Sequence, residues 1–254
     1  MKISIITATW NSGATLRDTL ESVLNQSYSD YELIIIDGGS KDNTKQIVDE
    51  YIPKFDGRLM WNCGRDKGLY DAMNKGIAKA TGDVVGILNS DDFYADSHVL
   101  EAIAKTCEQV DAVYGDLDFV DSLDTSKIVR QWRGSQHLPG SFMKGWHPAH
   151  PTFYAKKEIY DRFGGFDITF DVSADFELML RFLEKGKISS RYIPKTFVKM
   201  RMGGESTGSV GKIIQGNKNV LRAFRKNGFK VPHFYLIRRL APKAVNLIKN
   251  KLHF

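Results

Sequence analysis

The first 115 residues alternate between short apolar runs and amphipathic helical patterns, and this alternation limits the chain to one class of fold. The runs at 3–9 and 31–36 are rich in β-branched residues, as expected of strands that are covered on both faces. Between them, Leu16, Leu20 and Val23 recur on one face of a helix. The sequence therefore predicts an α/β fold, with a mostly parallel open sheet flanked by helices.

The pattern also predicts where the elements lie along the chain. Strands are expected near 3–9, 31–36, 58–61, 83–88, 111–115 and 191–201, and helices near 16–24, 42–51, 69–80, 97–108, 156–162, 173–185, 210–227 and 233–251. No stretch approaches the roughly 18–20 uncharged apolar residues of a membrane span, and the N-terminus indicates a buried strand rather than a signal peptide. Cys63 and Cys107 form neither a disulfide framework nor a zinc motif, so a cytoplasmic location is expected.

Charge divides the chain into two parts. The net charge is +6, but no Asp or Glu follows Glu205, and residues 206–254 hold eleven of the 36 Lys and Arg. We expect a body at 1–205 and a basic helical extension at 206–254, whose partner would be nucleic acid, a membrane surface or a phosphorylated substrate. Residues 233–251 mix apolar and basic side chains, which is typical of a helix lying on an anionic bilayer. A solvated face, or a helix packed on the body, explains the same pattern.

Polar side chains follow several of the expected strands. They are Thr9, Asn11, Asp37, Asp66, Asp91 and Asp92. Because open α/β sheets bind ligands outside the carboxyl ends of their strands, we expect these side chains to converge on one edge of the sheet. The first strand is not followed by G-x-G-x-x-G, and the chain has no G-x-x-x-x-G-K-[ST], which argues against a dinucleotide dehydrogenase and a P-loop enzyme.

The adjacent carboxylates Asp91 and Asp92 suggest a metal site. Two neighbouring negative charges repel each other, so a fold tolerates them best where a cation or solvent compensates. Mg²⁺ and Mn²⁺ favour carboxylate oxygen and keep open positions for substrate phosphates. Alternatively, an Asp in this region serves the N-terminus of the helix at 97–108.

Six segments together resemble one enzyme family. They are ISIITATWN (3–11), LESVLNQSYSDYELIIIDGGSKDNT (20–44), DKGLYDAMNKGIAKATGDVVGILNSDD (66–92), HPTFY (150–154), GGFD (164–167) and ADFELMLR (174–181). The sequence resembles the family 2 glycosyltransferases, which have the GT-A fold, use nucleotide sugars and occur in bacterial polysaccharide biosynthesis. The resemblance covers residues 1–205 and leaves the basic extension outside.

The resemblance implies a nucleotide-binding half at 1–115. Asp92 would ligate the metal that bridges the donor phosphates, and Asp91 would contact the ribose or a metal-bound water. The implied nucleotide-binding residues are Ala8, Thr9, Asn11, Asp37, Asp66 and Asp91. Many family members have a second Asp where this chain has Gly38, so base recognition would depend on Asp66 or on backbone groups. A UDP-sugar is the favoured donor.

The resemblance also implies an acceptor-binding half at 116–205. Asp175 would be the general base that deprotonates the acceptor hydroxyl. An Asp in the first turn of a helix is also favoured by the helix dipole, without any catalytic role. Tyr70, His150 and Trp146 are candidates for contacts with donor or acceptor, although aromatic residues in such loops usually serve packing.

Together these features predict an inverting, Mg²⁺- or Mn²⁺-dependent glycosyltransferase of the hexosyltransferase type. Its acceptor would be a saccharide or a polyprenyl-linked molecule, and the protein would be cytoplasmic, with peripheral attachment to the inner membrane face. One alternative is a catalytically inactive protein that binds nucleotide sugars, and another is a nucleic-acid- or membrane-binding protein that uses the basic tail. Nucleic acid is not expected, because the acidic sheet edge would repel its phosphates.

Overall fold

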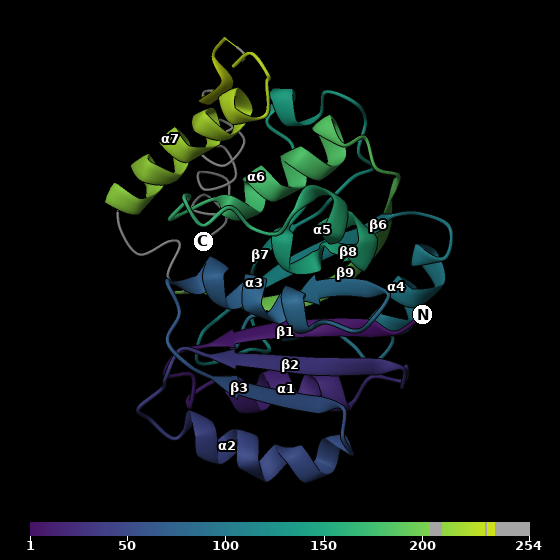
Figure 1. Cartoon of the computed structure of the whole chain (residues 1–254), viewed down its shortest axis with the longest axis vertical. Helices are drawn as coiled ribbons and strands as arrows, with labels where there is room; N and C mark the ends of the chain where they lie inside the picture. The colour runs from purple at the N-terminus through teal and green to yellow at the C-terminus, as the bar shows by residue number, and fades with distance from the viewer. Residues whose placement is uncertain (204–209, 232, 237–254) are drawn as a thin grey trace.

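The computed structural model describes residues 1–203, 210–231 and 233–236 (Figure 1). Its strands are β1 (Ile3–Thr9), β2 (Tyr31–Asp37), β3 (Leu59–Cys63), β4 (Val84–Ile87), β5 (Phe93–Tyr94), β6 (Ala112–Val120), β7 (Ile128–Trp132), β8 (Tyr154–Lys156) and β9 (Ser190–Arg201). Its α-helices are α1 (Leu16–Leu24), α2 (Thr44–Tyr51), α3 (Leu69–Lys79), α4 (Val99–Cys107), α5 (Lys157–Phe163), α6 (Ala174–Leu180) and α7 (Val210–Lys226). Short 3₁₀ segments lie at Ile52–Phe55, Phe142–Lys144 and His150–Thr152, and a π-helical turn lies at Arg181–Lys185.

The strands form one mixed sheet in the order β3-β2-β1-β4-β8-β6-β9-β5, with β7 paired to β6. The pairings among β1, β2, β3 and β4 are parallel, as the alternating sequence pattern predicted. The expected fifth strand lies elsewhere, because β8 inserts antiparallel between β4 and β6. The parallel pairings are therefore mainly those of β1 to β4. Because β8 is antiparallel to both β4 and β6, β6 runs in the same direction as β4. Sequence periodicity does not reveal strand neighbours, which is why the short β8 was not anticipated.

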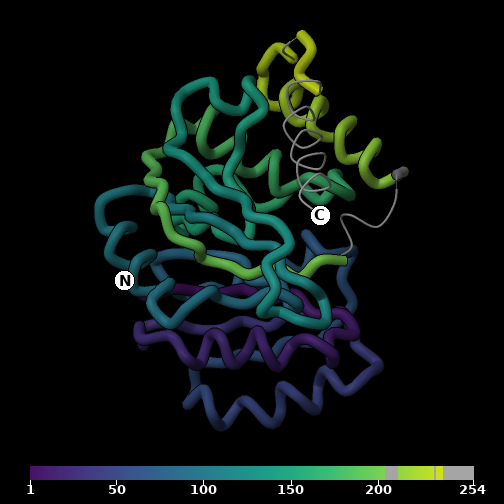
Figure 2. The backbone as a smooth tube through the Cα atoms, turned by 180° about the vertical axis from the view of Figure 1, so that it is seen from behind, coloured from purple at the N-terminus to yellow at the C-terminus, as the bar shows by residue number. Residues whose placement is uncertain are grey.

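Helices cover both faces of the sheet, as predicted (Figures 1 and 2). Along β1, Ile3 and Ile5 join a core with α1, α2 and α4, whereas Ile6 and Ala8 join a core with α3, α5, α6 and α7. This alternation follows from the period of two in a strand. All seven residues of β1 and of β2 are buried, which accounts for their continuous apolar composition. The two cores leave the carboxyl ends of β1, β2 and β4 on one edge of the sheet.

Two expected elements differ from the structure. The strand predicted at 111–115 continues to Val120, and the helix predicted at 173–185 divides into α6 and the π-helical turn. The helix predicted at 233–251 lies largely outside the described residues. Among the described residues, no helix has both the length and the apolar character that crossing a bilayer requires.

At the opposite edge of the sheet, Glu32 joins β1 and β2 to the turn before β4. It accepts hydrogen bonds from Lys2, Ser4 and Thr81 and forms an ion pair with Lys2 at 2.8 Å. Burial raises the pKa of Glu32, but the hydrogen bonds outweigh it and lower the pKa to about 2. A lowered pKa means that the ionised form stabilises the fold at neutral pH and that this stability is lost as the pH falls from the ordinary carboxyl range toward 2.

We expect Glu32→Gln to lower the free energy of unfolding by about 2 kcal/mol at pH 7, because it removes hydrogen bonds to a charged group. The difference between wild type and Glu32→Gln should shrink as the pH is lowered from about 5 toward 2, since both proteins are then neutral at this position. Urea unfolding followed at several pH values measures both effects. A difference that stays constant with pH would show that the charge of Glu32 does not stabilise the fold.

Candidate active site

Asp37 ends β2 and is the centre of a hydrogen-bond network at the strand ends. Its Oδ1 accepts hydrogen bonds from the hydroxyls of Thr9 (3.0 Å) and Ser40 (2.5 Å). Its Oδ2 accepts from the backbone N–H groups of Gly39 and Ser40 and from the thiol of Cys63. Burial raises the pKa of Asp37, but the hydrogen bonds outweigh it and hold the pKa below its ordinary value. Asp37 is therefore ionised and anchors the loop that follows β2.

The loop after β1 is tied to the same network. Asn11 has a left-handed backbone (φ 50°), and its N–H donates to the hydroxyl of Ser40 at 2.8 Å. Its side-chain oxygen accepts from the N–H of Lys41, also at 2.8 Å. The structure thus brings together, at one edge of the sheet, the predicted residues Ala8, Thr9, Asn11 and Asp37. Their contact with a nucleotide stays a prediction.

Gly38 lies between Asp66 and Trp10. A Cβ at position 38 would meet Asp66 Oδ2 at 2.9 Å and Trp10 Cε3 at 3.0 Å, so these two side chains fill the space that a side chain at position 38 would need. Trp10 is 62% exposed, unusually open for so large an apolar ring. Trp10 is a candidate contact that the sequence analysis missed, although a Trp directly after a buried strand is a signal that could have revealed it.

We expect Asp66→Ala to weaken UDP binding by about tenfold or more, because a charged hydrogen-bond acceptor beside Gly38 is lost. Isothermal titration calorimetry measures the change. Asp71→Ala is the matched control, because Asp71 lies on the nearby helix α3 and pairs with Lys75. Equal affinities of the two variants would exclude Asp66 from the nucleotide site.

Asp91 and Asp92 follow β4 at the same edge. Asp92 is fully buried, and its Oδ2 accepts a hydrogen bond from the Asn89 amide at 2.9 Å, whereas its Oδ1 is buried without a partner in the described structure. Burial and the neighbouring charge of Asp91 raise the pKa of Asp92 well above its ordinary value, and burial also raises the pKa of Asp91. Raised pKa values and a buried oxygen without a partner show two carboxyl groups whose negative charge is poorly compensated by the protein.

Arg201, at the end of β9, carries a positive charge that acts on both carboxyl groups. Its charge lowers the pKa of both Asp91 and Asp92, and its backbone N–H lowers the pKa of Asp92 further, but burial raises each pKa by more. Its guanidinium forms an ion pair with Asp18 and lies over the ring of Phe93, and its Nε is buried without a partner in the described structure. The sequence analysis did not single out Arg201. The only signal was its place two residues before the Gly-rich segment that begins at Gly203.

Asp175, Tyr70 and His150 come from three separate segments and lie together in the structure. The sequence analysis named each of them but did not predict this proximity, and their roles stay predictions. Burial raises the pKa of Tyr70, and the charge of Asp175 adds to the rise. Burial lowers the pKa of His150, against the opposing effect of Asp175, so the imidazole is neutral at physiological pH. Phe166 holds the cluster, because its ring stacks on Tyr70 and meets His150 edge to face, both at 5.4 Å between centroids.

Trp146 has different neighbours. Its ring packs edge to face against Tyr114 and Phe142, each at 5.9 Å, and lies 5.7 Å from His137. These contacts correspond to the packing interpretation of Trp146, whereas its contact with donor or acceptor stays a prediction. The neighbouring His147 packs against Phe176, which is the residue after Asp175.

Two motif residues hold the segment before Asp175. The Asn74 side chain donates to the carbonyl of Phe166 at 2.8 Å and accepts from its N–H at 2.7 Å. Arg181 donates to the carbonyls of Phe163, Gly164 and Gly165 and forms an ion pair with the buried Glu177. These contacts give Asn74 and Arg181 a positional rather than a chemical role.

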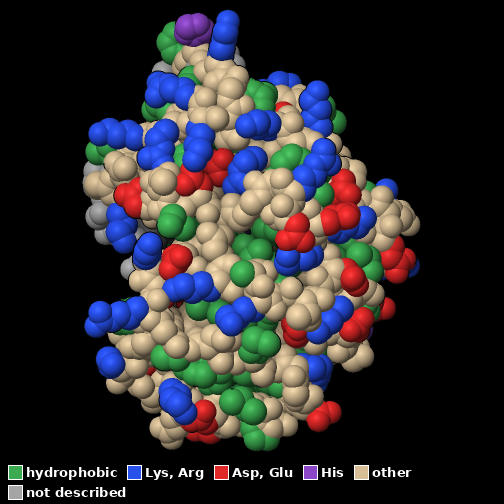
Figure 3. Space-filling view, viewed as in Figure 1, with side chains coloured by type: hydrophobic (Ala, Val, Ile, Leu, Met, Phe, Trp, Pro, Cys, Tyr) green, Lys and Arg blue, Asp and Glu red, His purple; other side chains and the backbone are tan. Residues whose placement is uncertain are grey.

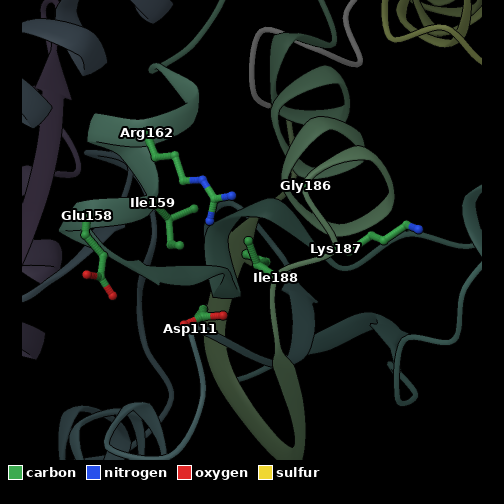
Figure 4. Close-up of a pocket in the computed structure, with 7 residues that line it drawn as sticks. All are labelled: Asp111, Glu158, Ile159, Arg162, Gly186, Lys187 and Ile188. Carbon is green, nitrogen blue, oxygen red and sulfur yellow. The ribbon is translucent and has the colours of Figure 1, made fainter.

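Two cavities lie at different edges of the sheet. A cavity of about 300 Å³ is lined by Asp111, Glu158, Ile159, Arg162, Gly186, Lys187 and Ile188 (Figure 4). Since Asp111 directly precedes β6, this cavity lies at the edge opposite Asp91 and Asp92 and does not belong to their site. A second hollow, of about 270 Å³, adjoins the ends of β2 and β3 and is lined by Ile36, Asn62, Cys63, Gly64, Arg65, Lys75 and Lys79.

The sequence profile of Glycosyl transferase family 2 matches residues 4–185. The chain belongs to this family. The glycosyltransferase is 30% identical over 197 residues to the PGL/p-HBAD biosynthesis glycosyltransferase of Mycobacterium tuberculosis, covering 75% of this chain and 73% of the relative. The predicted family membership and transferase activity class are thereby confirmed.

Solved structures confirm the GT-A fold. Residues 1–349 of S. aureus TarS, in complex with UDP-GlcNAc, superpose with a TM-score of 0.72 at 18% identity, covering 95% of this glycosyltransferase and 73% of that chain. The mannosyltransferase PcManGT of Pyrobaculum calidifontis, in complex with GDP-Man and Mn²⁺, gives 0.65 at 19% identity and covers 93% and 67%. The longer TarS chain is matched over 43% of its length.

Proposed function

We propose that this glycosyltransferase transfers a hexosyl group from a UDP-sugar to a hydroxyl of a saccharide or polyprenyl-linked acceptor, with inversion, in cell-surface polysaccharide assembly. The observation that carries the proposal is the carboxyl pair Asp91–Asp92 at the strand-end edge, whose pKa values burial raises and where Asp92 Oδ1 is buried without a hydrogen-bond partner in the described structure. Residues 1–115 would bind the nucleotide and residues 116–205 the acceptor, with 206–254 as a separate extension. Relatives that bind UDP-GlcNAc, or GDP-Man with Mn²⁺, support a nucleotide-sugar donor.

Asp91 and Asp92 fit a divalent cation. Their oxygens are hard ligands, and the Asp92 Oδ1 that lacks a protein partner is the kind of group a Mg²⁺ or Mn²⁺ ion satisfies. When bound, the ion would neutralise charge that develops on the departing diphosphate. Among the described residues, no group of three His, Cys, Asp or Glu side chains is placed to hold a metal, so we propose that phosphate and water oxygens complete the shell.

The remaining steps belong to the chain itself. Asp175 would accept the proton of the acceptor hydroxyl while the hydroxyl oxygen forms a bond to the anomeric carbon. The bond from that carbon to the phosphate oxygen breaks, and the nucleoside diphosphate leaves with the electron pair. Because attack and departure occur on opposite faces, one displacement inverts the anomeric centre. The neutral His150 and the hydroxyl of Tyr70, both beside Asp175, would orient the acceptor.

A thermal-shift screen of UDP, GDP and other nucleoside diphosphates, with and without Mn²⁺, tests the proposed donor. We expect the largest rise in melting temperature with UDP plus Mn²⁺, since a ligand that binds only the folded state stabilises it by mass action. No shift with any nucleotide would overturn the proposal. Hydrolysis or transfer of the matching UDP-sugar then separates a transferase from an inactive binding protein.

We further propose that the basic extension attaches the protein to the inner membrane face, where a polyprenyl-linked acceptor would be presented. Lys and Arg side chains gather over α7 in the upper part of the molecule (Figure 3), and residues 206–254 contain no acid. Flotation with anionic liposomes, comparing full-length protein with the variant Arg238→Glu, Arg239→Glu, tests this attachment. We expect wild type to float and the variant to stay behind; equal behaviour would exclude the tail as the anchor.

A further inference from the structure

Helix α7 lies outside the residues that match the family, yet it contacts the segment that leads to Asp175. That segment, residues 167–173, joins the turn held by Asn74 and Arg181 to the start of α6. We call it the base loop. Polar contacts join α7 and the turn after it to the base loop and to α6.

Asn219 is the most buried residue of α7 whose side chain makes such a contact. Its side-chain Nδ2 donates to Asp171 Oδ1 at 2.7 Å and to the carbonyl of Val172 at 2.8 Å. Asn219 is 2% exposed, on a helix face otherwise formed by apolar residues such as Val220 and Phe224. A buried amide on an apolar face costs stability unless its hydrogen bonds are made, and here both donors go to the base loop.

Four further contacts extend along α7. Arg222 donates to the carbonyl and the hydroxyl of Thr169, both at 2.8 Å, and lies over the ring of Phe170. Lys226 forms an ion pair with Asp167. Successive turns of α7, at Asn219, Arg222 and Lys226, therefore contact Asp171, Thr169 and Asp167 of the base loop.

The end of the base loop is strained. Ser173 has φ 67°, a left-handed conformation that a residue with a side chain adopts rarely and keeps only where its surroundings impose it. Its hydroxyl lies against α7 at Gly216, where an added Cβ would come within 3.3 Å of Ser173 Oγ. Asp175 follows two residues later.

The contacts continue into α6. Asn227 donates to Glu177 Oε1 at 3.0 Å, and Phe224 packs edge to face on Phe176, the residue next to Asp175. Residues before Asp175 (Ser173) and after it (Phe176 and Glu177) therefore contact α7 or the turn that follows it.

We propose that α7 is a clamp for the base loop and that Asn219 is its central positioning residue, which sets where the Asp175 carboxylate points. The proposal rests on the proposed function for the role of Asp175. It assigns a task to residues beyond the family domain: they hold the general base in place and leave the nucleotide site unchanged.

The decisive variant is Asn219→Asp, which keeps the size of the side chain but replaces its donors by acceptors facing Asp171 and the Val172 carbonyl. We expect kcat to fall at least tenfold, with the KM for the donor and the affinity for UDP changed less than twofold. Hydrogen exchange of the amides at 167–175 should accelerate. Lys218→Gln, which changes the exposed neighbour of Asn219, is the matched control and should behave as wild type in all three measurements.

A reciprocal exchange separates positioning from a general loss of structure. In the double variant Asp171→Asn, Asn219→Asp, the donor and the acceptor change places, so we expect at least part of the lost kcat to return. Arg222→Gln, at an exposed position, removes the hydrogen bonds to Thr169 and the contact with the Phe170 ring but leaves Asn219 in place. It should show a smaller loss of kcat in the same direction, even if Asn219→Asp fails to fold.

Three results would overturn the proposal: wild-type kcat in folded Asn219→Asp, a parallel loss of UDP affinity in that variant, or unchanged exchange at 167–175. A failure of the proposed function can be told apart from a failure of the clamp. If Asp175→Asn kept its turnover, the role of Asp175 as the base would fall, whereas the exchange measurements would still report whether α7 clamps the base loop.

Discussion

Asp175→Asn is expected to reduce sugar transfer by about a thousandfold, within the range of roughly 10²–10⁴ that general base catalysis contributes. The amide matches the carboxylate in size, so the contacts of Phe176 and the base loop should survive. Because the residues proposed to bind the nucleotide lie on other segments, the affinity for UDP should stay at the wild-type value. Initial rates with a UDP-sugar, together with calorimetric titration of UDP, measure both quantities.

The control for this variant is Glu158→Gln. It makes the same chemical change at the cavity on the opposite edge of the sheet, away from Asp175. Unimpaired transfer by Asp175→Asn would exclude Asp175 as the base. An equal loss of transfer in Glu158→Gln would show that the loss comes from the change of charge or from folding instead.

Asp92→Asn is expected to lose transfer by at least about a hundredfold, since electrostatic stabilisation of the leaving group would be lost. The Mn²⁺-dependent part of the thermal shift with UDP should disappear. Wild-type Mn²⁺ dependence in this variant would exclude Asp92 as a ligand.

The same variant should be more stable than wild type when no ligand is present. Burial and Asp91 raise the pKa of Asp92, so the folded state holds a proton more tightly than the unfolded state, and stability falls as the pH rises above about 4. A neutral amide removes this penalty, and we expect a gain of about 1 kcal/mol, or some 2–4 °C in melting temperature, at pH 7. Asp83→Asn, at the exposed start of β4, is the control for an Asp-to-Asn change.

The sequence predicted the strand-end site because its signals are local. Asp37 and Asp92 each follow a continuous apolar run, and parallel strands bring such positions to one edge. The candidate role of Asp175 came from the family resemblance instead, and its grouping with Tyr70 and His150 was not predicted, since no local pattern links residues on three separate segments. Their proximity in the structure depends on Phe166 and on the backbone contacts of Asn74.

Other features had no local signal. The insertion of β8 between β4 and β6 depends on pairing partners that composition does not specify. Arg201 reaches the Asp91–Asp92 pair because β9 runs beside the end of β6 and then pairs with β5. The role of Asn219 was hidden for a similar reason, because an Asn on a basic amphipathic helix has the pattern of an ordinary surface residue until its partners are known.

The engagement of both Asp37 oxygens has a kinetic consequence. Five hydrogen-bond donors already satisfy this carboxylate, so the loop after β2 is held in place, and the donor site proposed there would need no rearrangement to bind a nucleotide sugar. Donor association should then proceed in a single fast phase, at a rate set by encounter rather than by gating. The base loop, on the proposed acceptor side, depends instead on α7, which lies outside the residues 4–185 that match the family profile, so a slow conformational step is expected there.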